Sequence, residues 1–297
     1  MSDNWADTLN RTFDSSSGVV RWGVLGPEDG PPVVLLHGTP WSSYTWRGLA
    51  RALALRFRVF VWDMPGYGTS QKYDGQDVSL AAQARIFAEL LRHWDLHKDG
   101  LRQDGPHDHD GTGEGRQPAV LAHDFGGCVA LRAHLLHGAS YARLALVDVV
   151  ALAPWGSPSY RLLGSHAGVF EQLPPALHEA LVREYVGSAS AAGLHPRVLD
   201  QLVAPWLGKD GQGAFYRQIA QNDQRWTDEI EGCYGELALP VLICWGTADT
   251  WIPVDRAHRL AGLIPGAGLQ LIEGAGHLVQ EDAPARLTAV LQDFLRS

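Results

Sequence analysis

Two aspartates and a histidine stand at positions in the chain that suit nucleophilic hydrolysis. Asp124 lies in Val120-Leu121-Ala122-His123-Asp124-Phe125-Gly126-Gly127, which predicts an apolar strand running through a sharp turn into a helix. Asp249 and His277 each follow a later apolar stretch. In hydrolytic triads the histidine moves protons and an acid orients the histidine. We therefore predict Asp124 as the nucleophile, His277 as the general base and Asp249 as the acid.

Two of these assignments have alternatives within the same sequence. One alternative is that Asp124 only caps the following helix, since Asp is a favoured N-cap residue. The glycines at 126–127 favour the nucleophile, because small residues relieve crowding at a strained strand-to-helix turn. The identity of the acid stays open, because Asp255 lies close to Asp249 and Asp148 ends another predicted strand.

A second turn is expected beside Asp124. In Leu35-Leu36-His37-Gly38-Thr39-Pro40 a strand ends in a turn that contains glycine and can present the Thr39 backbone N–H. Together with the Phe125 N–H it would form an oxyanion hole, which stabilises negative charge on a tetrahedral intermediate. We expect His37 to be a structural residue of this turn and not a catalytic base.

The elements that must position these residues alternate along the chain. Short runs of Val, Leu and Ile are separated by longer amphipathic stretches, which is typical of an α/β fold with a mostly parallel sheet flanked by helices. The predicted strands are Pro32 to Leu36, Phe57 to Trp62, Ala119 to His123, Leu144 to Val149, Pro240 to Trp245 and Gly268 to Ile272. The predicted helices are Tyr44 to Leu55, Ser79 to Leu96, Gly126 to His137 and Ala283 to Leu295.

Two segments interrupt this alternation. Asp99 to Gln117 is crowded with Gly, Asp, His and Pro, and we expect a surface loop in which the run at 107–110 (His107, Asp108, His109, Asp110) is solvated and binds no metal. From about Ala151 to Leu237 helical patterns follow one another without a credible strand. We therefore predict a core at 1–150 and 238–297 with a helical cap inserted at 151–237.

Composition restricts the partners. The chain has 297 residues, 45% of them hydrophobic, and a net charge of −9 with no basic stretch, which argues against nucleic acid. No apolar run is long enough for a membrane span and no signal peptide is evident, so we expect a cytoplasmic protein. Cys128, Cys233 and Cys244 are expected to be reduced thiols. No phosphate loop or metal-ligand spacing implies a cofactor.

At this point the sequence resembles the Asp-nucleophile branch of the α/β-hydrolase superfamily, which includes epoxide hydrolases, haloalkane dehalogenases and fluoroacetate dehalogenases. The likeness covers nearly all of the chain from Pro31 to Ser297 and implies an α/β-hydrolase fold. Its most specific motifs are His37-Gly38-Thr39-Pro40, Asp63-Met64-Pro65-Gly66-Tyr67-Gly68-Thr69-Ser70, His123-Asp124-Phe125-Gly126-Gly127 and Gly274-Ala275-Gly276-His277.

An aspartate nucleophile changes the reaction. A carboxylate that attacks an ester gives an unstable anhydride, so the natural targets of Asp124 are sp³ carbons that bear a leaving group, as in epoxides and carbon–halogen bonds. Displacement leaves an alkyl ester on Asp124. Water activated by His277 then attacks the ester, and the oxyanion hole serves this second step.

The leaving group separates the two substrate classes. Haloalkane dehalogenases usually hold the halide with a Trp after the nucleophile and with an Asn after His-Gly or a cap Trp. Phe125 and Thr39 occupy the first two positions and offer no such side-chain donor. Cap tryptophans could donate instead, and the candidates are Trp155, Trp206 and Trp226. Phe125 also stands where fluoroacetate dehalogenases typically have Arg, which disfavours a small carboxylate substrate.

Epoxide hydrolases supply a proton to the departing oxygen from cap tyrosines, or from a tyrosine and a histidine. Tyr216 is the best candidate, since Ala214-Phe215-Tyr216-Arg217-Gln218 is similar to their tyrosine-arginine segment. A second donor would be Tyr160 or His166. The alternative for Tyr216 is that its ring only packs inside the cap.

These observations leave three hypotheses. The first is hydrolysis of a small apolar epoxide to a diol, and the second is dehalogenation. A third, from a different class, is ligand binding or a non-hydrolytic reaction, since one fold hosts unrelated functions. The sequence does not predict an oligomeric state.

Overall fold

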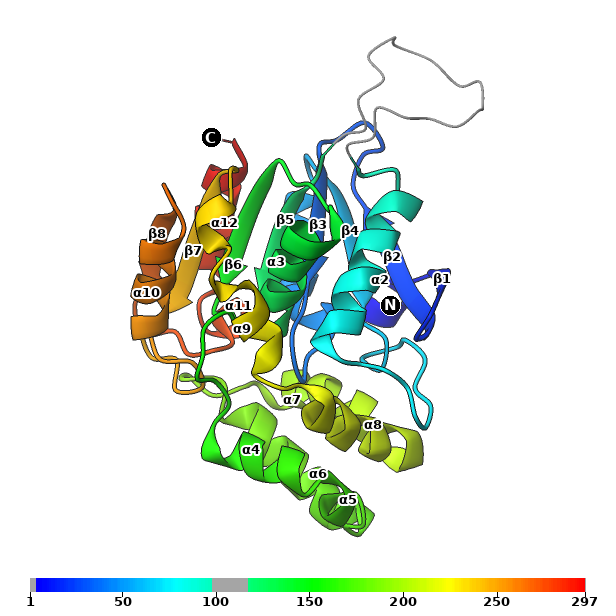
Figure 1. The fold of residues 1–297 in the computed structure, drawn as a ribbon. Coiled ribbons are helices and arrows are strands. Elements are labelled where there is room, and N and C mark those ends of the chain that lie inside the picture. Colours follow the sequence, from blue (N-terminus) through cyan, green and yellow to red (C-terminus); the bar gives the residue numbers. More distant parts are fainter. Residues whose placement is uncertain (1–3, 98–116, 297) are drawn as a thin grey trace.

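Eight strands form one mixed sheet in the computed structural model, which describes residues 4–97 and 117–296. Their order across the sheet is β1-β2-β4-β3-β5-β6-β7-β8, parallel from β4 to β8 and antiparallel at β1 and β2 (Figure 1). The strands are β1 (Arg11–Ser15), β2 (Gly18–Leu25), β3 (Pro32–Leu36), β4 (Arg58–Asp63), β5 (Ala119–His123), β6 (Arg143–Val147), β7 (Val241–Gly246) and β8 (Gly268–Ile272). The predicted α/β class is confirmed.

Alternate residues of the central strands face two separate hydrophobic cores. In β3, Val34 and Leu36 belong to one core and Val33 and Leu35 to the other, as the two-residue period of a strand requires. The first core is shared with α2 (Leu80–His93), α3 (Phe125–His137) and α10 (Asp255–Leu263), and the second with α1 (Arg47–Leu53) and α12 (Pro284–Arg296). Helices therefore cover both faces of the sheet.

Six α-helices lie between β6 and β7 in the sequence. They are α4 (Pro158–Ser165), α5 (Ala167–Phe170), α6 (Pro175–Gly187), α7 (Pro196–Val203), α8 (Gly208–Gln221) and α9 (Arg225–Glu231). Figure 1 shows α4 to α8 gathered below one end of the sheet, and we call these five helices the cap. In contrast, α9 packs against α3. The cap helices fall inside the predicted insert 151–237, whose boundaries stay a prediction.

Short elements complete the chain. They are η1 (Trp5–Thr8), η2 (Ser43–Trp46), η3 (Ala204–Trp206), η4 (Tyr234–Glu236) and α11 (Val279–Asp282). All six predicted strands are present within a few residues, but β1 and β2 were not predicted. The reason is that β1 is a largely exposed edge strand, with polar Arg11, Thr12 and Asp14. The predicted loop 99–117, with the run at 107–110, lies outside the described residues apart from Gln117.

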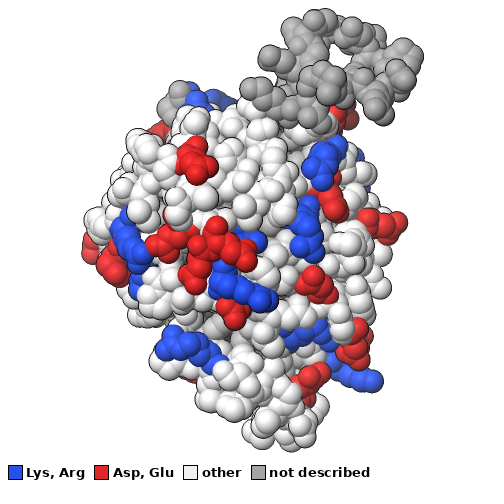
Figure 2. Space-filling view, in the orientation of Figure 1, with Lys and Arg blue, Asp and Glu red and all other residues white. Residues whose placement is uncertain are grey.

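The distribution of surface charge and the state of the cysteines can be described directly. Acidic and basic side chains are intermixed over the face drawn in Figure 2. Cys128, Cys233 and Cys244 are unpaired; Cys128 and Cys244 are buried, and Cys233 is half-buried. Across the described ranges, no helix has the length and apolar character needed to cross a membrane.

Candidate active site

Asp124 occupies a strained turn between β5 and α3. Its φ of 52° and ψ of −123° are unusual for a residue with a side chain. The two following glycines allow α3 to approach the sheet closely. A Cβ at Gly126 would lie 2.6 Å from the carbonyl oxygen of His37, and one at Gly127 would lie 2.3 Å from a methyl group of Val149. This geometry lifts the Asp124 side chain clear of the sheet, as in a nucleophile elbow.

The backbone of Thr39 holds the carboxylate of Asp124. The Thr39 N–H donates to Asp124 Oδ1 at 2.5 Å. Gly38 permits this approach, because a Cβ there would lie 2.1 Å from the same oxygen. Among the residues that the structure describes, the Asp124 side chain makes no capping hydrogen bond to α3. The Phe125 N–H opens α3, and N–H groups of a first turn have no partner inside their helix.

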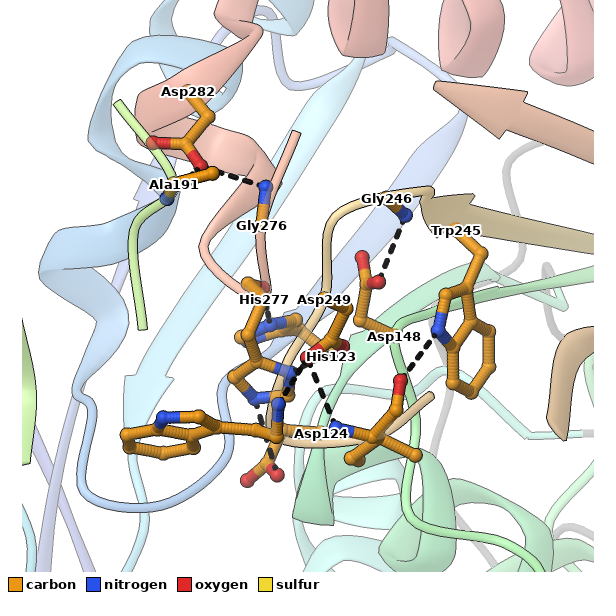
Figure 3. Close-up of polar contacts among 12 residues, drawn as sticks. His123, Asp124, Asp148, Ala191, Trp245, Gly246, Asp249, Gly276, His277 and Asp282 are labelled. Carbon is orange, nitrogen blue, oxygen red and sulfur yellow. Dashed lines mark hydrogen bonds and ion pairs between the residues drawn. The ribbon is translucent and has the colours of Figure 1, made fainter. Parts of the chain in front are cut away.

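His277 lies between the two aspartates (Figure 3). Its Nε2 is 3.4 Å from Asp124 Oδ2, and its Nδ1 is 2.9 Å from Asp249 Oδ2. The second oxygen of Asp249 accepts the backbone N–H groups of Trp251 and Ile252 at 2.8 and 2.9 Å. Because β5, β7 and β8 run parallel, the turns at their carboxyl ends bring these residues to one edge of the sheet.

The charges of the two aspartates control His277. Burial on its own lowers the pKa of His277, but the nearby carboxylates of Asp249 and Asp124 outweigh burial and raise this pKa well above its usual value. The imidazolium is therefore favoured while both aspartates are ionised.

A third carboxyl group lies behind this arrangement. Asp148, at the end of β6, is fully buried, and its Oδ1 accepts the Gly246 N–H at 2.9 Å. Its Oδ2 has no hydrogen-bond partner within the described part of the chain. Burial, followed by the charge of Asp249, raises the pKa of Asp148 well above its ordinary value, so the group is held as the neutral acid. Asp255 lies apart, exposed at the start of α10.

Two buried histidines support the turns. His37 Nδ1 donates to the Gly38 carbonyl and its Nε2 accepts the Met64 N–H, both at 2.9 Å, which is the structural role expected for it. His123 Nε2 donates to the carbonyl of His277 at 2.9 Å. Burial lowers the pKa of His123 to about 3, so this ring stays neutral. The role of His123 was missed, because nothing in the local sequence reveals a contact with a residue 154 positions later.

A small cavity of about 40 Å³ lies at Asp124 between the core and the cap. Its core wall includes Thr39, Phe125 and Ile252. Its opposite wall is mainly aromatic. The cap side contributes Trp155, Tyr160 and Tyr185, and the core contributes Trp251 beside them. No cluster of His, Cys, Asp and Glu suited to a metal ion occurs at 4–97 or 117–296.

Tyrosine hydroxyl groups are the candidate proton donors of this cavity. The Tyr160 hydroxyl is buried and has no hydrogen-bond partner within residues 4–97 and 117–296. Ser157 caps α4 by accepting the Tyr160 N–H at 3.1 Å, which fixes where this helix begins. Burial raises the pKa of Tyr160 and that of Tyr185 well above the usual value, so both phenols are neutral. Tyr185 was not predicted, since no motif marks it.

Comparison with known proteins identifies the fold family. The model of the alpha/beta hydrolase family matches residues 33–290. The chain belongs to this family. It is similar to a crystal structure of an alpha/beta hydrolase fold protein from Burkholderia ambifaria, with 44% identity, a TM-score of 0.86 and coverage of 96% of this chain and 97% of the other.

Two curated relatives of this hydrolase come from Mycobacterium tuberculosis. Haloalkane dehalogenase 2 is 26% identical over 95% of this chain and 93% of its own length. Epoxide hydrolase A is 26% identical over 96% of each chain. These names fit the suspected branch of the superfamily. The two relatives are equally identical to this chain, so sequence identity favours neither an epoxide nor a halide as substrate.

Tyr216 lies away from the cavity at Asp124 in this structure. In this hydrolase its side chain is fully buried inside the cap. Its hydroxyl lies 2.9 Å from His178 Nδ1, and His178 Nε2 lies 2.8 Å from the carbonyl of Trp206. Tyr216 therefore contributes to the internal hydrogen bonding of the cap. His166, the other suggested partner, is exposed and also lies away from the cavity.

The indole N–H groups suggested as halide donors already donate to other acceptors. Trp155 lines the cavity, but its N–H donates to Thr227 Oγ1 at 2.9 Å. Trp206 and Trp226 donate to backbone carbonyls at 2.7 and 3.3 Å. None of these three donors is available to a leaving group in this conformation.

Proposed function

We propose that this hydrolase converts an uncharged epoxide into a diol through an alkyl ester on Asp124. The observation that carries the proposal is the Tyr160 hydroxyl, a buried donor that lacks a hydrogen-bond partner in the described ranges and lines the same cavity as Asp124. A buried polar group without a partner is costly, and a substrate oxygen would supply one. An epoxide requires such a donor, because its oxygen leaves as an alkoxide.

In the first step Asp124 Oδ2 attacks one epoxide carbon, while Oδ1 stays on the Thr39 N–H. The carbon–oxygen bond opens, and the Tyr160 hydroxyl protonates the alkoxide as it forms. An alkoxide is more basic than a phenolate, so the raised pKa of Tyr160 does not prevent the transfer. The products are a hydroxyalkyl ester and a Tyr160 phenolate.

In the second step water attacks the carboxyl carbon of the ester. Esterification removes the negative charge of Asp124, which is one of the causes of the raised pKa of His277. The pKa of His277 therefore falls once the intermediate has formed, so the imidazolium releases its proton to solvent and the neutral ring can act as the base; it takes a proton back from solvent after Asp124 regains its charge. Negative charge on Oδ1 is stabilised by the Thr39 and Phe125 N–H groups.

Collapse of the tetrahedral intermediate breaks the bond between the carboxyl carbon and Oδ2. The imidazolium of His277 protonates the departing alkoxide, which completes the diol. Asp124 regains its carboxylate, and the proton that it releases restores Tyr160. The overall change is one epoxide and one water converted to one diol.

The test is mass spectrometry of His277→Gln, which cannot activate water, after exposure to mixed epoxides and haloalkanes. We expect an adduct on the peptide containing Asp124 that adds the full mass of an epoxide, and Asp124→Asn/His277→Gln should stay unmodified. An adduct from haloalkanes alone, which would lack the halogen, would replace the proposal with dehalogenation. A folded His277→Gln protein with no adduct would reject Asp124 as the nucleophile.

A further inference from the structure

The segment that carries His277 has little regular structure of its own. It connects β8 to α11, and hydrogen bonds tie it to several other parts of the chain, including the loop after β7, where the Ala248 N–H donates to the Ala275 carbonyl at 2.9 Å. His123 donates to the His277 carbonyl at 2.9 Å, the Leu278 N–H donates to the Ala189 carbonyl at 3.1 Å, and the Gly276 N–H donates to Asp282 Oδ2 at 2.7 Å. The position of the general base thus depends on partners beyond its own strand.

Asp282 joins this segment to the cap (Figure 3). Its Oδ2 accepts the Ala191 N–H at 2.8 Å as well as the Gly276 N–H at 2.7 Å, and its Oδ1 accepts the Ser190 hydroxyl. The two segments lie so close that a Cβ at Gly276 would be 2.7 Å from the Ala191 nitrogen. A single carboxylate therefore connects residues 190–191 to the turn that ends at His277.

The same part of the cap builds one wall of the cavity. Residue 188 directly follows α6, the helix that carries Tyr185. Ser188 Oγ accepts the Trp251 indole N–H at 3.2 Å. The Trp251 ring stacks on the His277 ring with centroids 5.0 Å apart, and it meets the Tyr185 ring at 4.7 Å. His277, Trp251 and Tyr185 thus form one continuous row of rings beside Asp124.

We infer that Asp282 is a positioning residue that holds the general base and the Tyr185–Trp251 wall of the cavity together as one unit. Without its carboxylate, the Gly276 and Ala191 N–H groups lose their shared acceptor. The Leu278–Ala189 hydrogen bond and the Trp251 ring then hold the His277 turn and the cap segment 188–191 together less firmly than the intact carboxylate does. The consequence for ester hydrolysis rests on the proposed function, whereas the coupling of the two segments does not.

The first test is hydrogen exchange in Asp282→Ala, Asp282→Asn and the control Asp293→Ala, which changes an exposed aspartate of α12. In Asp282→Ala we expect the Ala191 and Gly276 amides to exchange at least about tenfold faster, and both together. Asp282→Asn keeps an oxygen that can accept both N–H groups, so its exchange should stay within about threefold of wild type, as in the control. Faster exchange in only one segment, or in neither, would overturn the inference.

The second test is single-turnover kinetics with an epoxide that alkylates Asp124. Asp282→Ala should slow hydrolysis of the ester at least about tenfold, with a smaller effect on alkylation, and Asp282→Asn should restore it. A lower melting temperature with unchanged hydrolysis would reduce Asp282 to a purely structural role. If Asp282→Ala does not fold, Asp282→Ser, with one acceptor on a shorter side chain, takes its place.

The two tests separate the two claims. If no epoxide modifies Asp124 in His277→Gln, the proposed function fails, but the exchange measurement still decides whether Asp282 couples the segments. If ester forms and exchange in Asp282→Ala is unchanged, the inference fails and the proposed function stands.

Discussion

The two walls of the cavity are positioned by different means. On the core side, Asp124, Asp249 and His277 follow the carboxyl ends of strands, and backbone N–H groups or neighbouring side chains hold each of them. On the cap side, Tyr160 and Tyr185 project from helices, and their location depends on how each helix is rotated. The position of a side chain is therefore easier to predict from a sequence motif on the core side than on the cap side.

In helix α8, two residues that are close in sequence point in different directions. Gln218 reaches the core, where it accepts the hydroxyl groups of Thr39 at 2.6 Å and Tyr67 at 3.1 Å. Tyr216 lies two positions earlier, which is about 200° around a helix with about 100° per residue. It therefore points away, toward His178. A tyrosine-arginine motif identifies a segment of the cap, but it does not fix which side faces the substrate.

The largest expected effect comes from removing the nucleophile on the core side. Asp124→Asn should lower turnover of the alkylating epoxide by at least about 10⁴-fold, since no group nearby can replace the carboxylate. The melting temperature should change little, because Asp124 does not cap α3 and Asn tolerates positive φ. Steady-state kinetics and thermal unfolding check this. Residual activity above about one per cent would contradict the assignment of Asp124.

The next largest effect concerns the acid. Asp249→Asn should lower turnover by about 10²- to 10⁴-fold, because the amide no longer stabilises the charge of His277 and favours the wrong tautomer. Asp255→Asn is the matched control on an exposed residue and should be close to wild type. Kinetics on both variants decide the question that the sequence left open. Equal activities would remove Asp249 from the site.

On the cap side the comparison is between two tyrosines. Tyr160→Phe should lower kcat/KM by about 10²-fold, through loss of the donor to the departing oxygen. Tyr216→Phe should leave the kinetics within about threefold of wild type but lower the stability by about 1 kcal/mol, through loss of the hydrogen bond to His178. Kinetics and denaturant unfolding measure the two effects. The reverse pattern would restore the motif-based prediction.

The smallest expected kinetic effect belongs to Asp148. Because Asp148 is held as the neutral acid, Asp148→Asn should retain activity within about threefold of wild type. Its folded pKa is raised above the unfolded value of 3.8, so it destabilises the protein as pH rises above 3.8. The variant should thus be more stable than wild type at pH 7, with the difference vanishing near pH 4. Thermal unfolding between pH 4 and pH 7 measures the sign of this stability difference. A variant less stable than wild type at pH 7 would contradict the prediction.

Much of the sheet and of the core side of the site could be predicted, because short segments of the sequence are enough to indicate them. Buried strands are apolar runs, and the residues that follow them meet at one edge of a parallel sheet, which brought Asp124, Asp249 and His277 together. The edge strand β1 was missed because its exposed residues are polar. Tyr185 and Trp251 were missed because their approach to Asp124 depends on contacts between distant segments.

The stack of Trp251 on His277 has an optical consequence. The two rings lie 5.0 Å apart with an interplanar angle of 22°, and the Trp41 ring lies close to both, at 5.6 Å from Trp251 and 6.4 Å from His277. A protonated imidazole quenches the emission of an adjacent indole far more than a neutral one does. If His277 releases its proton when the ester forms, fluorescence rises with the intermediate and falls as the intermediate is hydrolysed. The enzyme then carries an intrinsic reporter of its own reaction, readable without a labelled substrate.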